Sequence, residues 1–257
     1  MSETWKTAIT EIKPNEVRLR GYRLDELMGN ISFGQAIYLA LKGELPTENL
    51  GKMIDAILVS SIDHGVTPPS ALAAMTIAST GAPLNAAVAG GILAISKYHG
   101  GAIRDCMGVL LQVQDKIKAR QLSVNKAAEE VVSEYKEIGR RISGFGHRYH
   151  TEDPRAARLF ALAEELKVGD HYIKIARAIE SELRAQTGNR LPINVDGAIA
   201  AVLCELDFPP KLGNAFFMMA RLPGLVAHAF EEQTREKPMR KITPDNYEYD
   251  GPEHRSM

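Results

Sequence analysis

Residues 86–98 read Ala-Ala-Val-Ala-Gly-Gly-Ile-Leu-Ala-Ile-Ser-Lys-Tyr. Apolar side chains recur in this stretch every three or four positions, which is the period of an α-helix. Its alanine and glycine residues let helix backbones pack closely, and helices of this composition are usually surrounded by other helices. The stretch therefore predicts a buried helix inside a helical protein.

The same period returns along most of the chain. It is found in Phe33–Leu41, Met53–Ile62, Ala71–Ser79, Met107–Ile117, Lys126–Ile138, Arg155–Leu166, Tyr172–Arg184, Ala198–Leu206 and Leu212–Phe230. Strand-like alternation is scarce, so the sequence predicts an all-α protein. Prolines and glycines mark the turns between segments, and after Arg235 the helical pattern is replaced by a proline-containing tail.

Composition narrows the classes of function. The chain has 257 residues, with 31 Lys and Arg against 32 Asp and Glu. Since the net charge is close to zero, no global field favours nucleic acid or an anionic membrane, and any anion must be bound locally. Cys106 and Cys204 lack the paired spacing of a metal site or a disulfide framework. The longest run of small apolar residues, 86–95, is too short to span a membrane, so a soluble cytoplasmic protein is expected.

Two histidines stand at predicted helix boundaries. His64 lies in Asp63-His64-Gly65, at the end of an apolar helix, where its local interpretation is a charge that offsets the helix dipole. His99 precedes Gly100-Gly101. A helix beginning at those glycines would keep the ring neutral, able to donate a hydrogen bond to a carbonyl or enolate oxygen. A structural histidine at a helix junction is the alternative for His99.

A glycine-rich segment, Gly144-Phe145-Gly146-His147-Arg148, follows later in the chain. Its two glycines let backbone amides approach a ligand, and a histidine and an arginine come directly after them. A phosphate-bearing ligand fits this composition, although the segment matches neither the P-loop nor the dinucleotide fingerprint. The alternative is an ordinary turn between helices.

Asp196 lies in Asn194-Val195-Asp196-Gly197, directly ahead of an apolar helix. It is either the N-cap of that helix or a shielded carboxyl group with a raised pKa, suited to general acid–base catalysis.

Three arginines are candidates for binding anions. Arg221 falls within an apolar segment, where a buried guanidinium needs an anionic partner from the protein or from a carboxylate ligand. Arg155 and Arg240 add positive charge, although each alone is more often a solvated surface residue.

In this order the motifs resemble the citrate synthase superfamily. The resemblance begins with residues 19–27, Ser32-Phe33, Tyr38-Leu39 and residues 43–46, and continues through Asp63-His64, residues 99–102, residues 144–148, residues 194–197 and Arg221. Within the superfamily, the C-terminal citryl-CoA lyase module of ATP-citrate lyase looks more similar still. It shares Asp-His-Gly, Gly-His-Arg and Asn-Val-Asp-Gly, and its ending is like Pro252 to Met257.

The resemblance implies a large helical lobe formed by residues 1–103 and 204–257, a small helical lobe formed by residues 104–203, and an active site in the cleft between them. It also implies a homodimer or a dimer of dimers. In such an assembly the C-terminal tail supplies a basic residue, Arg240 or Lys237, to the site of the neighbouring subunit.

The implied reaction is the cleavage of citryl-CoA into acetyl-CoA and oxaloacetate. His147 exchanges the hydroxyl proton, His99 hydrogen-bonds the thioester oxygen, and Asp196 protonates the enol carbon. The citryl carboxylates are held by His64, Arg155, Arg221 and Arg240. Coenzyme A is received by Gly144, Phe145, Gly146 and Arg148. The resemblance implies no metal and no permanently bound cofactor, because the coenzyme A thioester is itself the substrate.

One residue departs from the lyase pattern. His99 stands where ATP-citrate lyase has an aromatic residue, and it matches the citrate synthases instead. A citrate or methylcitrate synthase is therefore the first alternative. A non-catalytic coenzyme A-binding subunit is the second, and the joint presence of His99, His147 and Asp196 argues against it.

Overall fold

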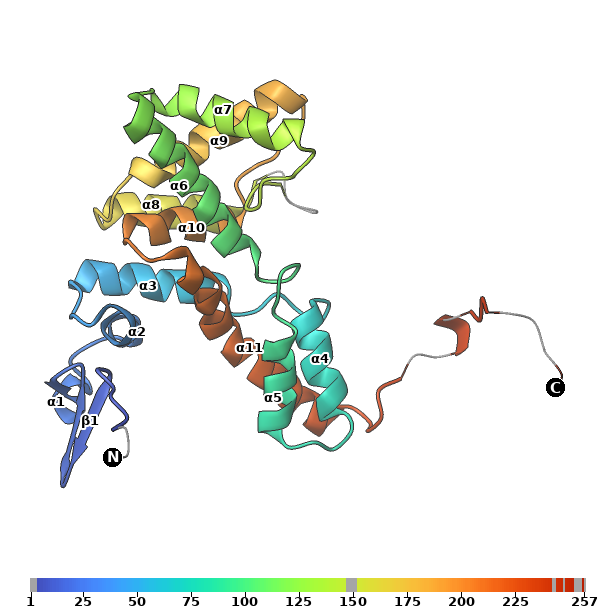
Figure 1. The fold of residues 1–257 in the computed structure, drawn as a ribbon. Coiled ribbons are helices and arrows are strands. Elements are labelled where there is room, and N and C mark those ends of the chain that lie inside the picture. Colours follow the sequence, from blue (N-terminus) through green and yellow to red (C-terminus); the bar gives the residue numbers. More distant parts are fainter. Residues whose placement is uncertain (1–3, 147–151, 242–243, 247, 252–255, 257) are drawn as a thin grey trace. The chain divides into compact units, whose positions relative to one another are not determined.

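The computed structural model describes residues 4–146, 152–241, 244–246, 248–251 and 256. The predicted all-α fold is confirmed (Figure 1). The helices are α1 (Leu24–Leu27), α2 (Phe33–Lys42), α3 (Glu48–Ser60), α4 (Pro69–Ala78), α5 (Leu84–Leu93), α6 (Ala102–Arg120), α7 (Val124–Glu137), α8 (Pro154–Glu165), α9 (His171–Thr187), α10 (Val195–Glu205) and α11 (Gly213–Arg235), with short 3-10 turns at Pro210–Leu212 and Pro244–Asn246. No described helix is both long and apolar enough to cross a bilayer.

Among the described residues, the helices are accompanied by a single β-sheet, a small antiparallel one near the N-terminus. Its strands are β1 (Thr10–Lys13), β2 (Glu16–Leu19) and β3 (Tyr22–Arg23). Leu19 pairs with Tyr22, so Arg20 and Gly21 form a two-residue turn, and both have positive φ angles of 51° and 90°. Such turns match the twist of a hairpin, which explains how so short a sheet closes.

The described chain divides into two compact units. The first comprises Met1–Asp63 and Ser96–Arg221, and the second comprises His64–Ile95 and Leu222–Met257. The boundary within α11 falls beside Pro223, whose ring removes a helix hydrogen bond. The lobe boundaries expected at residues 104 and 203 stay a prediction.

The core of the first unit is built around α10. Its residues from Gly197 to Cys204 are all buried, and α10 packs against α6, α8 and α9 (Figure 1). A helix that is apolar on every side is stable only when other helices surround it. This arrangement fixes the start of α10, which carries Asp196, against three other elements.

The second unit shows the close packing predicted from small residues. Helices α4 and α5 pack against each other, and Ala78, Ala87 and Ala229 form a buried cluster. A Cβ atom added to Gly91 would lie 3.0 Å from the Ser70 carbonyl oxygen and 3.1 Å from Ala74 Cβ. The absence of a side chain at Gly91 therefore sets the spacing between α4 and α5.

Candidate active site

The N-terminus of α10 is capped by Asn194. Its Oδ1 accepts hydrogen bonds from the backbone amides of Asp196 at 3.0 Å and Gly197 at 3.1 Å. The sequence left open whether Asp196 caps this helix, and the structure gives that role to Asn194. The carboxyl group of Asp196 is therefore not needed to hold the helix.

Asn194 also holds the glycine-rich segment. Its Nδ2 donates to the Gly146 carbonyl at 2.9 Å, and its backbone amide donates to the Gly144 carbonyl at 3.0 Å. The Gly146 amide donates to the Pro192 carbonyl at 2.7 Å. The segment from Gly144 to Gly146 thus lies directly against the start of α10, whereas His147 and Arg148 lie outside the described residues.

Two glycines permit this close approach. A Cβ atom on Gly197 would lie 2.3 Å from the Gly144 carbonyl oxygen. Gly144 has a φ of 89°, and a Cβ atom there would lie 2.7 Å from Cys106 Sγ. A side chain at either position would push the segment away from α10.

Gly197→Ala is accordingly expected to lower the free energy of unfolding by about 1–3 kcal/mol, the usual cost of forcing atoms into a packed core. Urea denaturation measures this change. Gly108→Ala is the matched control, because Gly108 is an exposed helical residue of α6 with nothing within 4 Å of an added Cβ atom. There alanine is expected to stabilise by about 0.5–1 kcal/mol. Equal effects of the two substitutions would contradict the close contact.

The environment of Asp196 changes its acidity. Burial raises the pKa of Asp196 from 3.8 to about 6, and the neighbouring Asp153 carboxylate adds to the rise. The guanidinium groups of Arg155 and Arg221 act in the opposite direction. A carboxyl group with this pKa can hold and release a proton near neutral pH, as an acid–base catalyst must.

The raised pKa of Asp196 implies a dependence of stability on pH. Between about pH 4 and pH 6 the folded state binds more protons than the unfolded state, so the stability associated with Asp196 is complete below about pH 4 and lost as the pH rises through about 6. An asparagine side chain at this position would not titrate.

The free energy of unfolding of Asp196→Asn, relative to the parent, is therefore expected to increase by up to about 3 kcal/mol between pH 4 and pH 7. Chemical denaturation of both proteins at the two pH values measures the difference. A constant difference would show that the pKa is not raised.

Asp153 connects Arg155 to the start of α10. Its carboxylate accepts two bonds from the Arg155 guanidinium, at 3.0 and 2.9 Å, and one from the Val195 amide at 3.0 Å. The side chain of Asp153 is fully buried, while that of Arg155 stays one quarter exposed. Arg155 is thus held in a fixed orientation with part of its guanidinium accessible.

Arg221 is buried, and the charges of Asp63 and Asp196 act on its guanidinium. It is 3% exposed, and its Nε donates to the Ser61 carbonyl at 3.0 Å. Its guanidinium lies over the Phe217 ring, 4.9 Å from the centroid, while Nη1 has no hydrogen-bond partner in the described part of the chain. Burial lowers the pKa of Arg221, and Asp63 partly offsets that effect. An unsatisfied buried donor of this kind suits a carboxylate ligand.

Phe217, which contacts Arg221, also contacts His99. The two rings meet edge to face, with centroids 5.5 Å apart, and His99 is half-buried. Four predicted site residues therefore lie near one another in the first compact unit. Phe217 contacts both His99 and Arg221. The charges of Asp153, Arg155 and Arg221 all act on Asp196.

His64 and Arg240 belong to the second compact unit. His64 is exposed there. The Nε of Arg240 donates to both carboxylate oxygens of Glu232, at 2.9 and 3.0 Å, and the Glu232 side chain is almost fully buried. The proposed substrate contacts of His64 and Arg240 stay predictions.

The sequence patterns did not identify three residues of the site, Asp153, Phe217 and Ser61. Asp153 precedes Pro154, a pattern that indicates a helix N-cap but does not reveal its bonds to Arg155 and Val195. Phe217 and Ser61 follow the ordinary helical period, so their contacts with Arg221 depend on the tertiary fold.

The chain is similar to known proteins both in sequence and in structure. Residues 47–242 match the family model described as "Citrate synthase, C-terminal domain". A citryl-CoA lyase from Hydrogenobacter thermophilus has 46% identity and a TM-score of 0.90, over 99% of this chain and 98% of that one. ATP citrate lyase from Methanothrix soehngenii, solved with citrate and coenzyme A, has 22% identity and a TM-score of 0.86, over 98% of this chain and 42% of that one.

Curated relatives carry synthase names. "Putative citrate synthase 2" of Mycobacterium tuberculosis is 36% identical over 208 residues, which are 79% of this chain and 52% of that protein. "Citrate/2-methylcitrate synthase" of Bacillus subtilis is 30% identical over 213 residues, 80% of this chain and 54% of that protein. The chain thus spans about half the length of the curated relatives it matches.

Proposed function

Because the chain belongs to the citrate synthase family, we propose that it is a cytoplasmic citryl-CoA lyase, which cleaves citryl-CoA into acetyl-CoA and oxaloacetate. One observation carries this choice. The match to a citryl-CoA lyase has 46% identity and a TM-score of 0.90 over nearly the whole of both chains, whereas a citrate synthase matched over a similar share of both chains has 19% identity and a TM-score of 0.61. The catalytic roles below rest on this proposal.

Arg221 and Arg155 bind the carboxylates of the citryl group. Arg221 offers a buried Nη1 donor that has no partner among the described residues, and Arg155 offers a guanidinium fixed by Asp153. Charge-assisted hydrogen bonds in a shielded site orient the substrate as well as hold it. The two arginines therefore place the carbon–carbon bond that breaks.

Cleavage begins when the tertiary hydroxyl of citryl-CoA gives its proton to His147. The alkoxide electrons form the carbonyl of oxaloacetate, and the electrons of the broken carbon–carbon bond pass to the acetyl-CoA enolate. His99 donates a hydrogen bond to the thioester oxygen, where the negative charge develops. Asp196 then gives its proton to the carbon of that enolate. The site returns to its starting state when His147 loses its proton to solvent and Asp196 takes one from solvent.

Citrate synthesis is the second candidate, and His99 favours it because the resemblance assigns that histidine to the synthase pattern. The two candidates differ in the fate of the thioester. A lyase acting on citryl-CoA releases acetyl-CoA and oxaloacetate and leaves the thioester intact. A synthase given acetyl-CoA and oxaloacetate releases free coenzyme A and citrate. Assays of free thiol in both directions are expected to show cleavage of citryl-CoA without thiol release.

The expected assembly is a homodimer or a dimer of dimers. Exposed apolar side chains on the helices of the second unit support it, notably Leu72, Leu93 and Phe230. Apolar side chains left exposed on a protein surface often mark an interface.

Arg221→Met tests the carboxylate role. It is expected to reduce kcat/KM for citryl-CoA by about 10- to 100-fold, mainly through a higher KM, because charged hydrogen bonds are each worth about 1.5–3 kcal/mol. Stability is expected to be equal or higher, since a buried guanidinium with an unsatisfied donor is removed. Steady-state kinetics and thermal melting measure both effects.

Arg158→Met is the control for this substitution, because Arg158 is exposed and pairs with Glu165 on the surface. If the Arg221→Met protein has the parental KM, Arg221 does not bind the substrate.

A further inference from the structure

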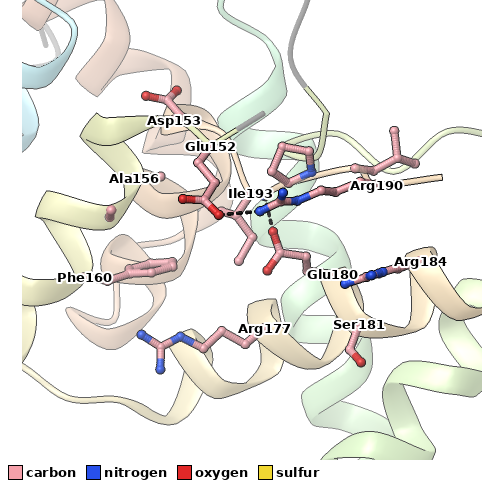
Figure 2. Close-up of a pocket in the computed structure, with 13 residues that line it drawn as sticks. Glu152, Asp153, Ala156, Phe160, Arg177, Glu180, Ser181, Arg184, Arg190 and Ile193 are labelled. Carbon is pink, nitrogen blue, oxygen red and sulfur yellow. Dashed lines mark hydrogen bonds and ion pairs between the residues drawn. The ribbon is translucent and has the colours of Figure 1, made fainter. Parts of the chain in front are cut away.

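A pocket lies within the first compact unit, between α8 and α9 (Figure 2). Its volume is about 410 Å³, a size typical of sites for small molecules. Ala156 and Phe160 line it from α8, and Arg177, Ser181 and Arg184 line it from α9. The segment from Arg190 to Ile193 forms another wall. Asp153, which holds Arg155, also lines the pocket, whereas the residues of α8 and α9 named here have no part in the proposed cleavage of citryl-CoA.

The carboxylates of the pocket are already engaged. Asp153 is bound to Arg155 and to the Val195 amide. Glu180 Oε1 accepts from the Ile193 amide at 2.7 Å, and Glu152 forms an ion pair with Arg190 (Figure 2). Asp153 and Glu152 are thus paired with arginines outside the pair Arg177 and Arg184, whereas Glu180 keeps its charge and offsets one of those two cations, so the pocket retains an excess of positive charge.

Two guanidinium groups remain. Among the residues that the structure describes, neither Arg177 nor Arg184 forms an ion pair; Arg177 lies over the Phe160 ring, 5.7 Å from its centroid. They are seven residues apart on α9, which is two helical turns and about 10 Å along the axis, so both lie on the same face. Ser181 lies between them in sequence, on the same side of α9.

We propose that this pocket binds a phosphate-bearing ligand of nucleotide size through Arg177 and Arg184. Guanidinium forks match the geometry of phosphate oxygens, and two of them from one helix face, two turns apart, suit two anionic groups or an extended phosphate chain. Ser181 supplies a neutral hydrogen bond between the two cations, and the ring and methyl groups of Phe160 and Ala156 supply the apolar part of the site.

The ligand would contact a segment that also shapes the candidate active site. Ile193 is held by Glu180 inside the pocket wall, and the next residue, Asn194, caps α10 and binds Gly146. The two sites thus share one short backbone segment, although the binding of a phosphate ligand does not depend on the proposed lyase activity.

Isothermal titration calorimetry with ADP tests the proposal on the whole chain. Saturable binding of one ADP per chain is expected, with a dissociation constant below about 1 mM. Arg177→Ala and Arg184→Ala are each expected to weaken binding about tenfold, and Arg184→Lys less, because lysine keeps the charge without the fork. Arg158→Ala, on the exposed surface of α8, is the matched control and keeps parental affinity.

Competition distinguishes the source of the phosphate. If saturating coenzyme A blocks ADP in an Arg184-dependent way, the pocket receives the nucleotide end of that thiol; if both bind together, it is a separate nucleotide site. No saturable ADP binding up to about 10 mM, or full affinity in the Arg177→Ala/Arg184→Ala protein with an unchanged thermal melt, would overturn the proposal. Either negative result leaves citryl-CoA cleavage untouched, and a missing lyase activity leaves the ADP result untouched.

Discussion

Asp196→Asn is expected to slow citryl-CoA turnover by about 100-fold or more while coenzyme A binding and folding persist. The amide has nearly the same volume as the carboxyl group, and it cannot give a proton to the enol carbon. Asn194, and not Asp196, caps α10, so the substitution leaves the cap in place. Steady-state kinetics and calorimetry with coenzyme A measure the two effects separately.

Asp105→Asn is the matched control for Asp196→Asn. Asp105 also lies in the first turn of a helix, α6, and its side chain is exposed. It is expected to keep the parental rate. A parental rate in Asp196→Asn would assign the enol proton to another group, and a collapse of folding would indicate that the carboxyl group is structural.

His99→Ala is expected to lower kcat for citryl-CoA by about 100-fold with a much smaller change in KM. The hydrogen bond from His99 strengthens as the thioester oxygen gains charge, so its loss affects the transition state more than the bound substrate. The edge-to-face contact with Phe217 fixes the ring, and alanine removes that contact as well.

His99→Gln separates these two roles. Glutamine retains an N–H donor without the ring, so it is expected to recover part of the rate lost in His99→Ala. If His99→Gln and His99→Ala are equally slow and both melt at a lower temperature, His99 supports Phe217 and does not act on the thioester.

Helical periodicity predicted the fold class well, because buried helices leave a strong repeat in the sequence. The periodicity predicted less well where helices end and where short strands form, because local contacts decide those features. The apolar run continues to Tyr98, yet α5 ends at Leu93, and a turn follows in which Ser96 and His99 exchange backbone hydrogen bonds. The N-terminal sheet was not predicted, since its strands are short and depend on turn residues such as Arg20.

The candidate site was predicted by residue type but not by geometry. The pattern at residues 194–197 contains two good capping residues, and only the structure shows that Asn194 caps α10 and leaves Asp196 available. Arg221 was expected to need an anionic partner from the protein or from a ligand. The structure places its Nε against the Ser61 carbonyl and its guanidinium over the Phe217 ring, and a carboxylate ligand stays a prediction. Asp153 was missed because its bond to the Val195 amide joins segments 42 residues apart, which local sequence patterns do not reveal.

A single turnover of citryl-CoA in deuterium oxide, with enzyme in excess, tests the central proposal most directly. Transfer of a solvent-exchanged proton from Asp196 to the enol carbon would yield oxaloacetate and acetyl-CoA in equal amounts, with one deuterium in the acetyl methyl group and no free coenzyme A. Mass spectrometry of the thioester reads the label, and Asp196→Asn should give little labelled product in the same time. Release of free coenzyme A and citrate would contradict the lyase assignment.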